Sequence, residues 1–428
     1  MELNIMVIGS GGREHALVWK LAQSPLAEKI YAVPGNPGIA ELATCVENIN
    51  VKDHAAVIDF AQRNEIGLVV IGPEAPLVEG LADDLIAADI KAFGPTAAAA
   101  QLEGSKIFAK QLMKKYAIPT ARYEIFSDAD AAKDYVRREG APIVVKADGL
   151  AAGKGVIVAQ TVDEALNAID EIMTQKSFGA AGNRIVVEEF MDGEEASLLA
   201  FTDGKTVVPM IPSQDHKRVD DGDLGLNTGG MGSYAPAPIV DQNVLNAAVE
   251  KILKPTVEAM SKEGKTYRGC LYAGLMIVNG EPKVVEFNAR FGDPETQVVL
   301  PLLKSDLVEL MIACADGTLD GRTIDWSDES AVCVILASGG YPKSYRKGMA
   351  IDGINKAKAL GVLIFHAGTA QRDGELITSG GRVLGVVTLD KNLRAAVEKN
   401  YKAVGVINFE GMHFRHDIAA RALNRSKE

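Results

Sequence analysis

The stretch IVVKADGLAAGKGVIVA, residues 143–159, decides how the middle of the chain folds. The apolar runs at its two ends predict short strands, and the glycine-rich turn 148–155 between them predicts an antiparallel hairpin. A Walker A phosphate loop has the pattern G-x-x-x-x-G-K-[ST]. Here Gly149 and Gly153 are one residue too close, and Gly155 stands where a Ser or Thr would hold magnesium. A nucleotide phosphate is therefore expected under a hairpin and not at a helix N-terminus.

Three lysines in this part of the chain are candidates for binding phosphate. Lys154 stands in the turn itself, and Lys146 lies in the apolar strand before it. A lysine within an apolar strand is expected to have a functional partner, because burying an unpaired ammonium group is costly. Lys106, at the start of a helix expected over residues 106–116, is the third candidate cation.

Residues 283–290, KVVEFNAR, predict a strand that carries chemistry. Because side chains alternate along a strand, Glu286, Asn288 and Arg290 are expected on one face, and the odd-numbered positions from Val285 onward on the other. A carboxylate and an amide oxygen suit Mg²⁺ bound together with substrate phosphates, and a guanidinium group can stabilise a transferring phosphoryl group. The alternative interpretation is an exposed polar face.

Short apolar strands alternate with helical patterns from residue 3 to about residue 96. This alternation predicts a parallel sheet with crossover helices, one of them around residues 77–88. The functional loops of such a sheet lie at the carboxyl ends of its strands, here at 9–14, 34–38, 72–76 and 94–96.

The first of these loops, GSGGREH at residues 9–15, matches the dinucleotide fingerprint G-x-G-x-x-G only in part. Glu14 occupies the third glycine position, where a large side chain obstructs close packing of the helix. A glycine turn at a helix N-terminus with Arg13 beside it suits a single phosphate monoester. An ordinary strand-to-helix turn is the alternative.

Two further segments of the middle region carry polar groups. The strand expected at RIVVEEF, residues 184–190, is followed by Glu195, an acid that can accept hydrogen bonds from ribose hydroxyls. The glycine-rich polar stretch 213–234 has no amphipathic period, so it is predicted to be a functional flap or a disordered insert.

The end of the chain predicts a third, smaller α/β unit. The strands AVCVILAS, VLIFHAG and RVLGVVTLD alternate with glycine-rich turns, and a final helix is expected from His416. No internal repeat of fixed period is present, so a solenoid is excluded.

Composition and charge narrow the functional classes. Apolar residues make up 47% and charged residues 24% of the 428 residues, as in soluble globular proteins. The net charge of −12 argues against nucleic acid as the main partner. The four cysteines show no metal-ligand spacing, and no apolar run approaches the length of a membrane helix. The N-terminus lacks the pattern of a signal peptide, so a cytoplasmic protein is expected.

In chain order, GSGGREHAL, KADGLAAGKGV, VVEEFMDGEEAS, NTGGMG, EFN and RFGDPETQ resemble the phosphoribosylamine-glycine ligase family, also called glycinamide ribonucleotide synthetases, of the ATP-grasp superfamily. The resemblance covers essentially the whole chain. It implies a multidomain α/β fold: a Rossmann-like, parallel-sheet domain at 1–103, an ATP-grasp domain at 104–326 and a small C-terminal α/β domain at 327–428. The hairpin is expected in a mobile subdomain at about 121–192.

The resemblance also implies an ATP-dependent ligase of purine biosynthesis. The carboxylate of glycine would attack the γ-phosphate of ATP, and the amine of 5-phosphoribosylamine would displace phosphate from the glycyl phosphate. The partners implied are these three small molecules, with Mg²⁺ or Mn²⁺ as the cofactor and with neither nucleic acid nor membrane. A monomer, or a weak dimer, is expected.

Residue roles follow from the resemblance at matching positions. The groups implied to hold the ATP phosphates are Lys106, Lys146, Gly149, Gly153, Lys154 and Gly155. The groups implied at the adenosine are the backbones of Glu188, Glu189 and Phe190 and the carboxylate of Glu195. Glu286 and Asn288 would bind the metal, and the catalytic residues implied are Arg290, Lys146 and Asp215.

The same resemblance implies where the other substrates bind. The residues implied for the phosphoribosyl group are Gly11, Gly12, Arg13, Asn36, Gly72, Pro73 and Glu74. The residues implied near glycine and the amine are Asp215, Asn227, Thr228, Gly229, Gly230 and Met231, with Arg290 beside them.

One feature departs from the wider superfamily. Many ATP-grasp enzymes carry an acidic metal ligand on the strand before the E-x-N strand, but GCLYAGLMIV, residues 269–278, contains no acid. Either the ligand of a second metal comes from elsewhere, or Glu286 bridges both ions. The competing functions are another ATP-grasp ligase or carboxylase, a catalytically silent ATP-binding protein and an NAD-linked oxidoreductase.

Overall fold

A computed structural model describes residues 2–150 and 155–425. The N-terminal region forms a five-stranded parallel sheet in the order β3-β2-β1-β4-β5, as predicted. Its strands and main helices are β1 (Leu3–Gly9), α1 (Gly12–Leu21), β2 (Ala27–Pro34), β3 (Thr44–Cys45), α2 (His54–Arg63), β4 (Ile66–Ile71) and β5 (Ala92–Phe93). The loops after β1 and β4 lie side by side at the carboxyl edge, where the strand order reverses.

The single helix expected around residues 77–88 is two helices, α3 (Glu74–Glu79) and α4 (Leu81–Ala87). Gly80 separates them with a φ of +95°, a left-handed conformation that interrupts the helix. The first helix also begins earlier than expected, directly after Pro73, so that Glu74 lies in its first turn.

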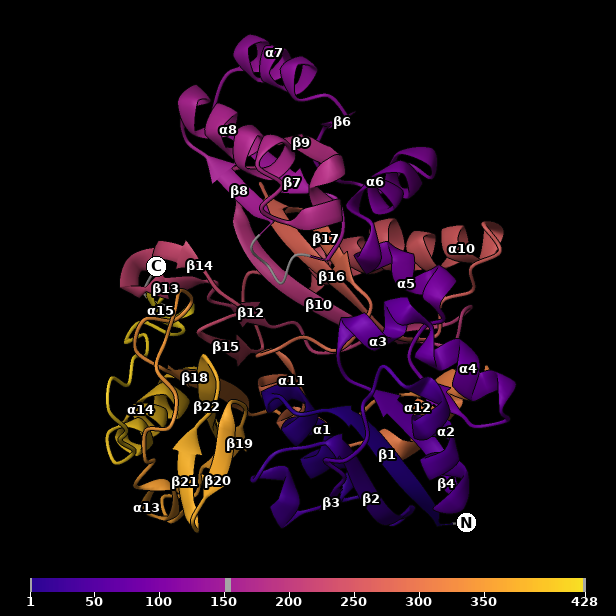
Figure 1. Cartoon of the computed structure of the whole chain (residues 1–428), viewed down its shortest axis with the longest axis vertical. Helices are drawn as coiled ribbons and strands as arrows, with labels where there is room; N and C mark the ends of the chain where they lie inside the picture. Colours follow the sequence, from indigo (N-terminus) through magenta and orange to yellow (C-terminus); the bar gives the residue numbers. More distant parts are fainter. Residues whose placement is uncertain (1, 151–154, 426–428) are drawn as a thin grey trace.

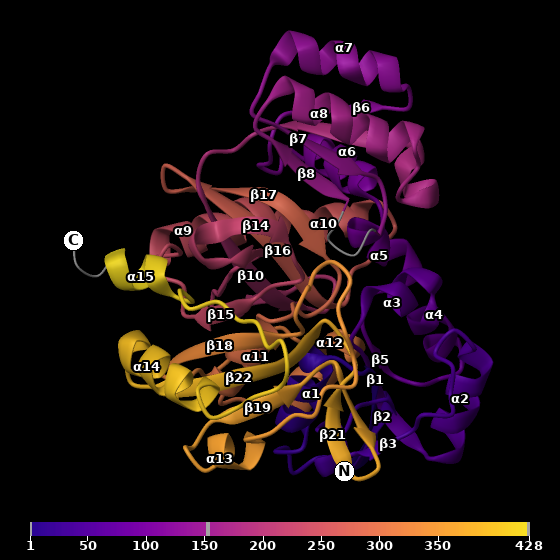
Figure 2. The ribbon, with the colours of Figure 1, turned by 60° about the vertical axis from the view of Figure 1, so that its left-hand side comes forward.

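The middle region contains two four-stranded sheets joined at an angle (Figure 1). The first has the order β6-β9-β7-β8, and its strands are β6 (Tyr123–Phe126), β7 (Ile143–Ala147), β8 (Val156–Ala159) and β9 (Ile185–Glu189). Strands β7 and β8 pair antiparallel, which confirms the predicted hairpin. This sheet, α7 (Ala129–Glu139) and α8 (Val162–Ile169) form a lobe at one end of the molecule in both views (Figures 1 and 2). We call it the upper lobe.

The second sheet lies below the upper lobe and has the order β11-β10-β16-β17. Its strands are β10 (Glu194–Thr202), β11 (Val207–Pro209), β16 (Gly269–Val278) and β17 (Glu281–Asn288). Helix α5 (Ala97–Gly104) contacts α3 and β17, and α6 (Lys106–Lys115) contacts β17 and β9 of the upper lobe.

The polar stretch 213–234 is not a disordered insert, so that alternative is wrong. It forms short strands, namely β12 (Gln214–Asp215), β13 (Arg218–Asp220), β14 (Leu224–Asn227) and β15 (Gly232–Ala235). Periodicity did not reveal these strands because each has only two to four residues, and because β15 pairs with β18, which is distant in sequence.

The C-terminal region completes a five-stranded sheet in the order β12-β15-β18-β22-β19. Its own strands are β18 (Ser330–Ala337), β19 (Leu363–His366) and β22 (Arg382–Asp390), and α14 (Leu393–Val404) packs on β18 and β22. The last helix, α15 (Ala420–Arg425), begins after the expected His416, because that residue is held by Asp221, whose carboxylate accepts from the His416 N–H at 2.7 Å. Among the described helices, none is both long and apolar enough to cross a membrane.

Candidate active site

The upper lobe meets the second sheet along strand β17. The backbone N–H of Val284 donates to Pro119 O at 2.8 Å, which joins the strand to the segment that enters the upper lobe. From the opposite side, Lys146 Nζ on β7 donates to Val285 O on β17 at 3.0 Å. The catalytic strand predicted from the sequence therefore lies directly under the predicted phosphate-binding lysine.

Lys146 belongs to a buried cluster of three charged side chains. Its Nζ lies 3.0 Å from Glu188 Oε1, and Lys110 Nζ lies 3.0 Å from Glu188 Oε2. Each of the three residues exposes no more than 3% of its surface. We call Lys110, Lys146 and Glu188 the lysine cluster. Sequence reasoning missed Lys110 because its helix position shows only that it is one of several lysines.

Lys106 lies next to the predicted hairpin turn. Its Nζ donates to Gly149 O at 2.9 Å, and Gly149 adopts a φ of +116° that favours glycine. Burial and the neighbouring ammonium of Lys146 lower the pKa of Lys106, whereas Glu286 opposes that change. Gly155 O accepts from Ala147 N–H at the other end of the turn. The predicted residues Gly153 and Lys154 lie outside the described residues.

Strand β17 presents its polar residues differently from simple alternation. Its pairing with β16 shifts register between Gly274 and Leu275, so that an extra residue is inserted at Val285. Val284, and not Val285, joins the core with Phe287. The expected position of Val285 on the core face is therefore wrong, and its carbonyl is instead turned to Lys146.

Glu286 and Asn288 follow the bulge on β17. Burial alone would raise the pKa of Glu286, but the ammonium groups of Lys217 and Lys146 outweigh burial and lower it. The side-chain oxygen of Asn288 accepts from Arg290 Nη2 at 3.2 Å. An ionised carboxylate beside an amide oxygen fits a hard divalent cation that also binds phosphate and water. No group of three or more His, Cys, Asp or Glu in the described part of the chain could hold a metal alone.

Arg290 connects β17 to the N-terminal region. Its guanidinium lies 3.0 Å from Glu103 Oε1 and 3.3 Å from Glu74 Oε2. Burial would lower the pKa of Arg290, but these two carboxylates raise it. Glu103 also accepts from the Ala289 N–H at 2.6 Å, so it orients the residue before Arg290 as well. Sequence reasoning missed Glu103 because it lies in an alanine-rich helix with no motif around it.

The residues predicted to hold adenosine lie at the end of β9 and just after it. Arg122 Nε donates to Glu189 Oε2 at 2.6 Å, which ties the start of the upper lobe to its last strand. Phe190 keeps 38% of its surface exposed, a large share for an aromatic side chain. Glu195 pairs with Lys217 at 2.8 Å. The carboxylates of Glu195 and Glu286 outweigh burial and raise the pKa of Lys217 well above its usual value.

Asp215 and Glu295 form a second charged region, which we call the acid pair. Burial and the carboxylate of Glu295 raise the pKa of Asp215 well above its ordinary value. Glu295 is 2% exposed, and its Oε1 accepts from Tyr272 OH at 2.6 Å and from Ser197 Oγ at 3.0 Å. Asp215 Oδ1, in contrast, is buried with no hydrogen-bond partner among the described residues. A buried acceptor without a donor is costly, so this position suits a cationic ligand.

The C-terminal region holds the predicted loop 227–232 in place. Arg382 Nη1 donates to Gly229 O and, at 2.8 Å, to Asp293 O, and its Nη2 pairs with Asp293 Oδ2 at 2.9 Å. Tyr341 OH accepts from Gly229 N–H at 3.0 Å. Sequence reasoning missed Arg382 and Tyr341, because more than 100 residues separate each of them from the loop.

Within this loop the predicted residues differ in what they offer. Thr228 Oγ1 donates to Lys217 O and accepts from Gly230 N–H at 2.9 Å, so it shapes the turn. Asn227 ends β14. The side chain of Met231 is fully buried and packs with Val219, so only its backbone remains for a substrate role.

The N-terminal glycine turn is closed by its own acid. The Glu14 carboxylate accepts from Gly11 N–H and from Arg13 Nε, each at 2.6 Å. Its side chain also fills the space beside Gly9, where a Cβ would lie 2.5 Å from Glu14 Cγ. The Glu14 carboxylate thus binds the backbone donor of the turn at Gly11, and a Cβ at Gly12 would strike Gln297 Nε2 at 2.7 Å. Arg13 also donates to Phe291 O at 3.2 Å.

The other N-terminal residues of the prediction lie around this turn. Asn36 is 8% exposed; its Nδ2 donates to Ser10 O and His366 O, and its Oδ1 accepts from the loop that follows. Gly72 contacts the Glu14 side chain, and Pro73 starts the helix that carries Glu74. The structure therefore brings the predicted phosphoribosyl residues to the sheet edge that faces Arg290.

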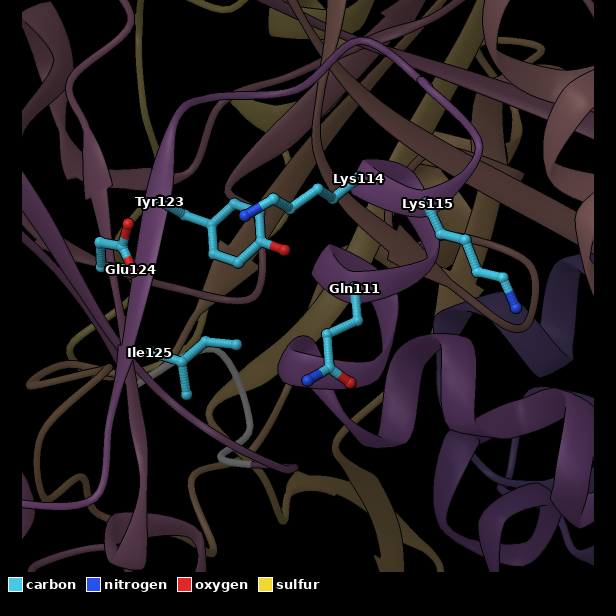
Figure 3. A pocket seen from close by; sticks show the side chains of 6 residues that line it. All are labelled: Gln111, Lys114, Lys115, Tyr123, Glu124 and Ile125. Carbon is cyan, nitrogen blue, oxygen red and sulfur yellow. The ribbon is translucent and has the colours of Figure 1, made fainter.

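A surface depression of about 410 Å³ lies apart from all these groups, between α6 and β6 (Figure 3). Its lining residues are Gln111, Lys114, Lys115, Tyr123, Glu124 and Ile125. None of these is a predicted site residue, and the depression opens on the face of α6 that carries the exposed Lys114.

Comparison with known protein families matches three consecutive parts of the chain. They are the phosphoribosylglycinamide synthetase N domain at residues 3–103, its ATP-grasp (A) domain at 104–296 and its C domain at 331–421. The chain belongs to the phosphoribosylglycinamide synthetase family. A phosphoribosylamine–glycine ligase of Haemophilus influenzae is 51% identical over 426 residues, which are 99% of each chain. The resemblance inferred from the motifs is thus confirmed.

Solved structures agree with this membership. A phosphoribosylamine–glycine ligase from Thermotoga maritima superposes with a TM-score of 0.85 at 33% identity, over 97% of this chain and 100% of that one. The biotin carboxylase domain of a Hydrogenobacter thermophilus 2-oxoglutarate carboxylase superposes with a TM-score of 0.73 at 15% identity, over 97% and 92% of the two chains. The second likeness concerns the fold alone, and it confirms the multidomain α/β class that the sequence predicted.

Proposed function

We propose that this protein ligates glycine to 5-phosphoribosylamine at the expense of ATP. The glycine carboxylate attacks the γ-phosphorus, the bond to the β-phosphate oxygen breaks, and ADP leaves. The amine of phosphoribosylamine then attacks the carbonyl carbon of glycyl phosphate, and phosphate leaves as the amide of glycinamide ribonucleotide forms. A carboxylate is a poor acyl donor, so phosphorylation provides the leaving group that the second step needs.

The observation that carries this proposal is the convergence of cations on the acid and amide of β17. Lys146 donates to the backbone of β17, and Arg290 donates to the side chain of Asn288. The carboxylate of Glu286 attracts the ammonium group of Lys106 and so favours its charged form. In the proposal, Lys106, Lys146 and the turn 148–155 hold the phosphates. The exposed Phe190 and the backbone of β9 face the adenine, and Glu195 accepts from the ribose hydroxyls.

Glu286 and Asn288 would hold the divalent cation, Mg²⁺ or Mn²⁺. When bound, this ion supplies charge neutralisation for the phosphates. Arg290 orients and stabilises the transferring phosphoryl group through its planar guanidinium, which Glu74 and Glu103 hold in a fixed plane. The same two carboxylates raise the pKa of Arg290, so its guanidinium group stays positively charged.

The acid pair would hold the ammonium group of glycine. The unpartnered Oδ1 of Asp215 is the acceptor that an ammonium proton would satisfy, and Glu295 adds negative charge beside it. The loop 227–232 closes this side of the substrate. The loops at Gly11 to Arg13 and Gly72 to Glu74 would hold the phosphoribosyl group, together with Asn36, which donates to Ser10 O beside the first loop.

No dedicated general base is assigned, because a correctly placed amine reacts readily with an acyl phosphate. We propose a monomer or a weak dimer as the active species. From the family membership, we also propose that the reaction takes place in the cytoplasm.

Another ATP-grasp ligase with a different acceptor is not favoured by the family membership. ADP release from ATP and Mg²⁺ tests the acceptor directly, with phosphoribosylamine generated in place from ribose 5-phosphate and ammonia. Turnover should require both glycine and phosphoribosylamine and should yield a product of glycinamide ribonucleotide mass. Turnover that is indifferent to phosphoribosylamine would exclude the proposed acceptor.

A further inference from the structure

We propose that Lys110 is a positioning residue of the ATP site. It neutralises Glu188, so that the positive charge of Lys146 remains available to bind the phosphates. The inference rests on the proposed function, because it concerns the same ATP site. It differs from the family resemblance in assigning a role to a residue that no motif marks.

The geometry of the lysine cluster carries the argument. The two oxygens of Glu188 are divided between two ammonium groups, each at 3.0 Å. Two lysines and one carboxylate leave one net positive charge in a place that water barely reaches, since the three residues are at most 3% exposed. Charges interact strongly in such surroundings, so the balance among the three decides how firmly Lys146 is held by Glu188.

The surroundings of Lys110 direct it away from a substrate. Its Nζ donates to Thr120 Oγ1 at 2.8 Å, and Thr120 Oγ1 donates in turn to Val284 O at 2.7 Å. Tyr123 covers a further side, with its ring centroid 5.6 Å from the ammonium. Lys110 is therefore fixed by protein groups on α6, β6, β9 and β17.

Lys146 has a different set of partners. It donates to Val285 O and forms an ion pair with Glu188 Oε1, and an ammonium group carries three protons. A proton of Lys146 therefore remains available to a phosphate oxygen. If Lys110 were absent, Glu188 and Lys146 would form a neutral pair, and the cluster would lose the charge that attracts phosphate.

The cost of burying Lys110 supports a role for its charge. Burial lowers the pKa of Lys110 to about 8, although Glu188 opposes that change. An apolar side chain of similar length would fill the same space without this cost. The charge is therefore the property that the position uses.

The test measures how strongly each variant distinguishes ATP from AMP. The variants are Lys110→Met, Glu188→Gln and the double variant, with Lys114→Met as a matched control from the exposed face of the same helix (Figure 3). Dissociation constants for AMP and for MgATP are obtained by displacement of trinitrophenyl-ATP. The ratio of the AMP dissociation constant to the MgATP dissociation constant measures what the β- and γ-phosphates contribute to binding. Any effect of Glu188 on adenine recognition cancels in this ratio.

Lys110→Met should lower the ratio by about tenfold, as expected for loss of one partner of a buried charge pair. The double variant carries one lysine and no carboxylate, so it regains the net positive charge and should return to within about threefold of the original protein. Lys114→Met should leave the ratio unchanged. An unchanged ratio in Lys110→Met, or a double variant no better than Lys110→Met, would overturn the proposal.

Thermal unfolding monitored by circular dichroism shows which variants are folded. If Lys110→Met does not fold, Lys110→Gln takes its place: it can still donate to Glu188 but carries no charge, so it should also lower the ratio. An unchanged ratio in Lys110→Gln would likewise overturn the role of Lys110. If the unaltered protein itself binds ATP no better than AMP, the proposed ATP site fails, which is a separate result.

Discussion

The lysine cluster and the acid pair are built on opposite principles. In the lysine cluster, each charged group has an oppositely charged partner at 3.0 Å. In the acid pair, Glu295 is satisfied by Tyr272 and Ser197, whereas Asp215 keeps a buried oxygen without a donor. The first region pairs opposite charges within the protein, whereas the second places two acids close together.

This difference predicts how each region binds its ligand. A balanced cluster with one net positive charge attracts anionic phosphates without rearranging. A buried acid with a raised pKa is destabilised until an ammonium group arrives, so it selects for charge and for fit. Strand β17 is joined to the lysine cluster by the hydrogen bond from Lys146 to Val285 O, and Glu286 follows on the same strand.

Removal of the Glu286 carboxylate should have the largest effect. Glu286→Ala should reduce ADP formation by about a thousandfold or more, because it removes the proposed metal ligand and the carboxylate that interacts with Lys217, Lys146 and Lys106. Release of ADP from MgATP with both substrates is the measurement. The melting temperature should stay close to that of the unaltered protein, and near-normal turnover would refute the metal assignment.

Arg290→Lys should come next, with a loss of about a hundredfold in kcat. Lysine keeps the positive charge but cannot contact Glu74, Glu103 and the phosphoryl group in one plane. Single-turnover ADP formation separates this loss from any change in product release. Full activity of this variant would remove Arg290 from the mechanism and leave it as a link between domains.

Asp215→Asn should separate the acid pair from the lysine cluster. The amide keeps the shape but removes the charge, so KM for glycine should rise by about tenfold while KM for ATP changes little. Asp220→Asn, an exposed position on the neighbouring strand, is the matched control. Equal losses for glycine and ATP would mean that the two regions are not distinct in their ligands.

Local sequence predicted the parts of this site whose pattern is contained in a few consecutive residues. The β7–β8 hairpin, the parallel N-terminal sheet and the E-x-N strand depend on short-range alternation and glycine turns, and the structure contains all three. The bulge at Val285 was missed because it arises from pairing with β16 and not from the composition of β17.

Partners that are distant in sequence could not be predicted in this way. Glu103 reaches Arg290 across 187 positions, and Arg382 reaches Gly229 across 153. Each comes from a segment whose local pattern indicates only a helix or a strand. Glu14 was predicted only in part. The sequence showed that it breaks a dinucleotide fingerprint, and the structure adds that its carboxylate accepts from the Gly11 N–H of the same turn.

Acidification should act outside both charged regions and have the smallest effect on catalysis. His15 and His366 are 5% and 3% exposed at the contact of the N-terminal and C-terminal regions, and His15 Nδ1 accepts from His366 N–H at 2.8 Å. Burial lowers the pKa of His15 to about 3 and that of His366 to about 4. Both histidines therefore remain neutral in the folded protein but take up protons below about pH 6.5 in the unfolded chain. Their contribution to stability is full above pH 6.5 and is lost as the pH falls toward 4.

Between pH 7 and pH 5 the free energy of unfolding should fall by about 2 kcal/mol for each histidine, measured by urea unfolding. His366→Gln removes one titrating group, so its pH dependence should be shallower by that amount. An identical slope in this variant would show that the contact does not titrate, and that the pH dependence belongs to the charged regions instead.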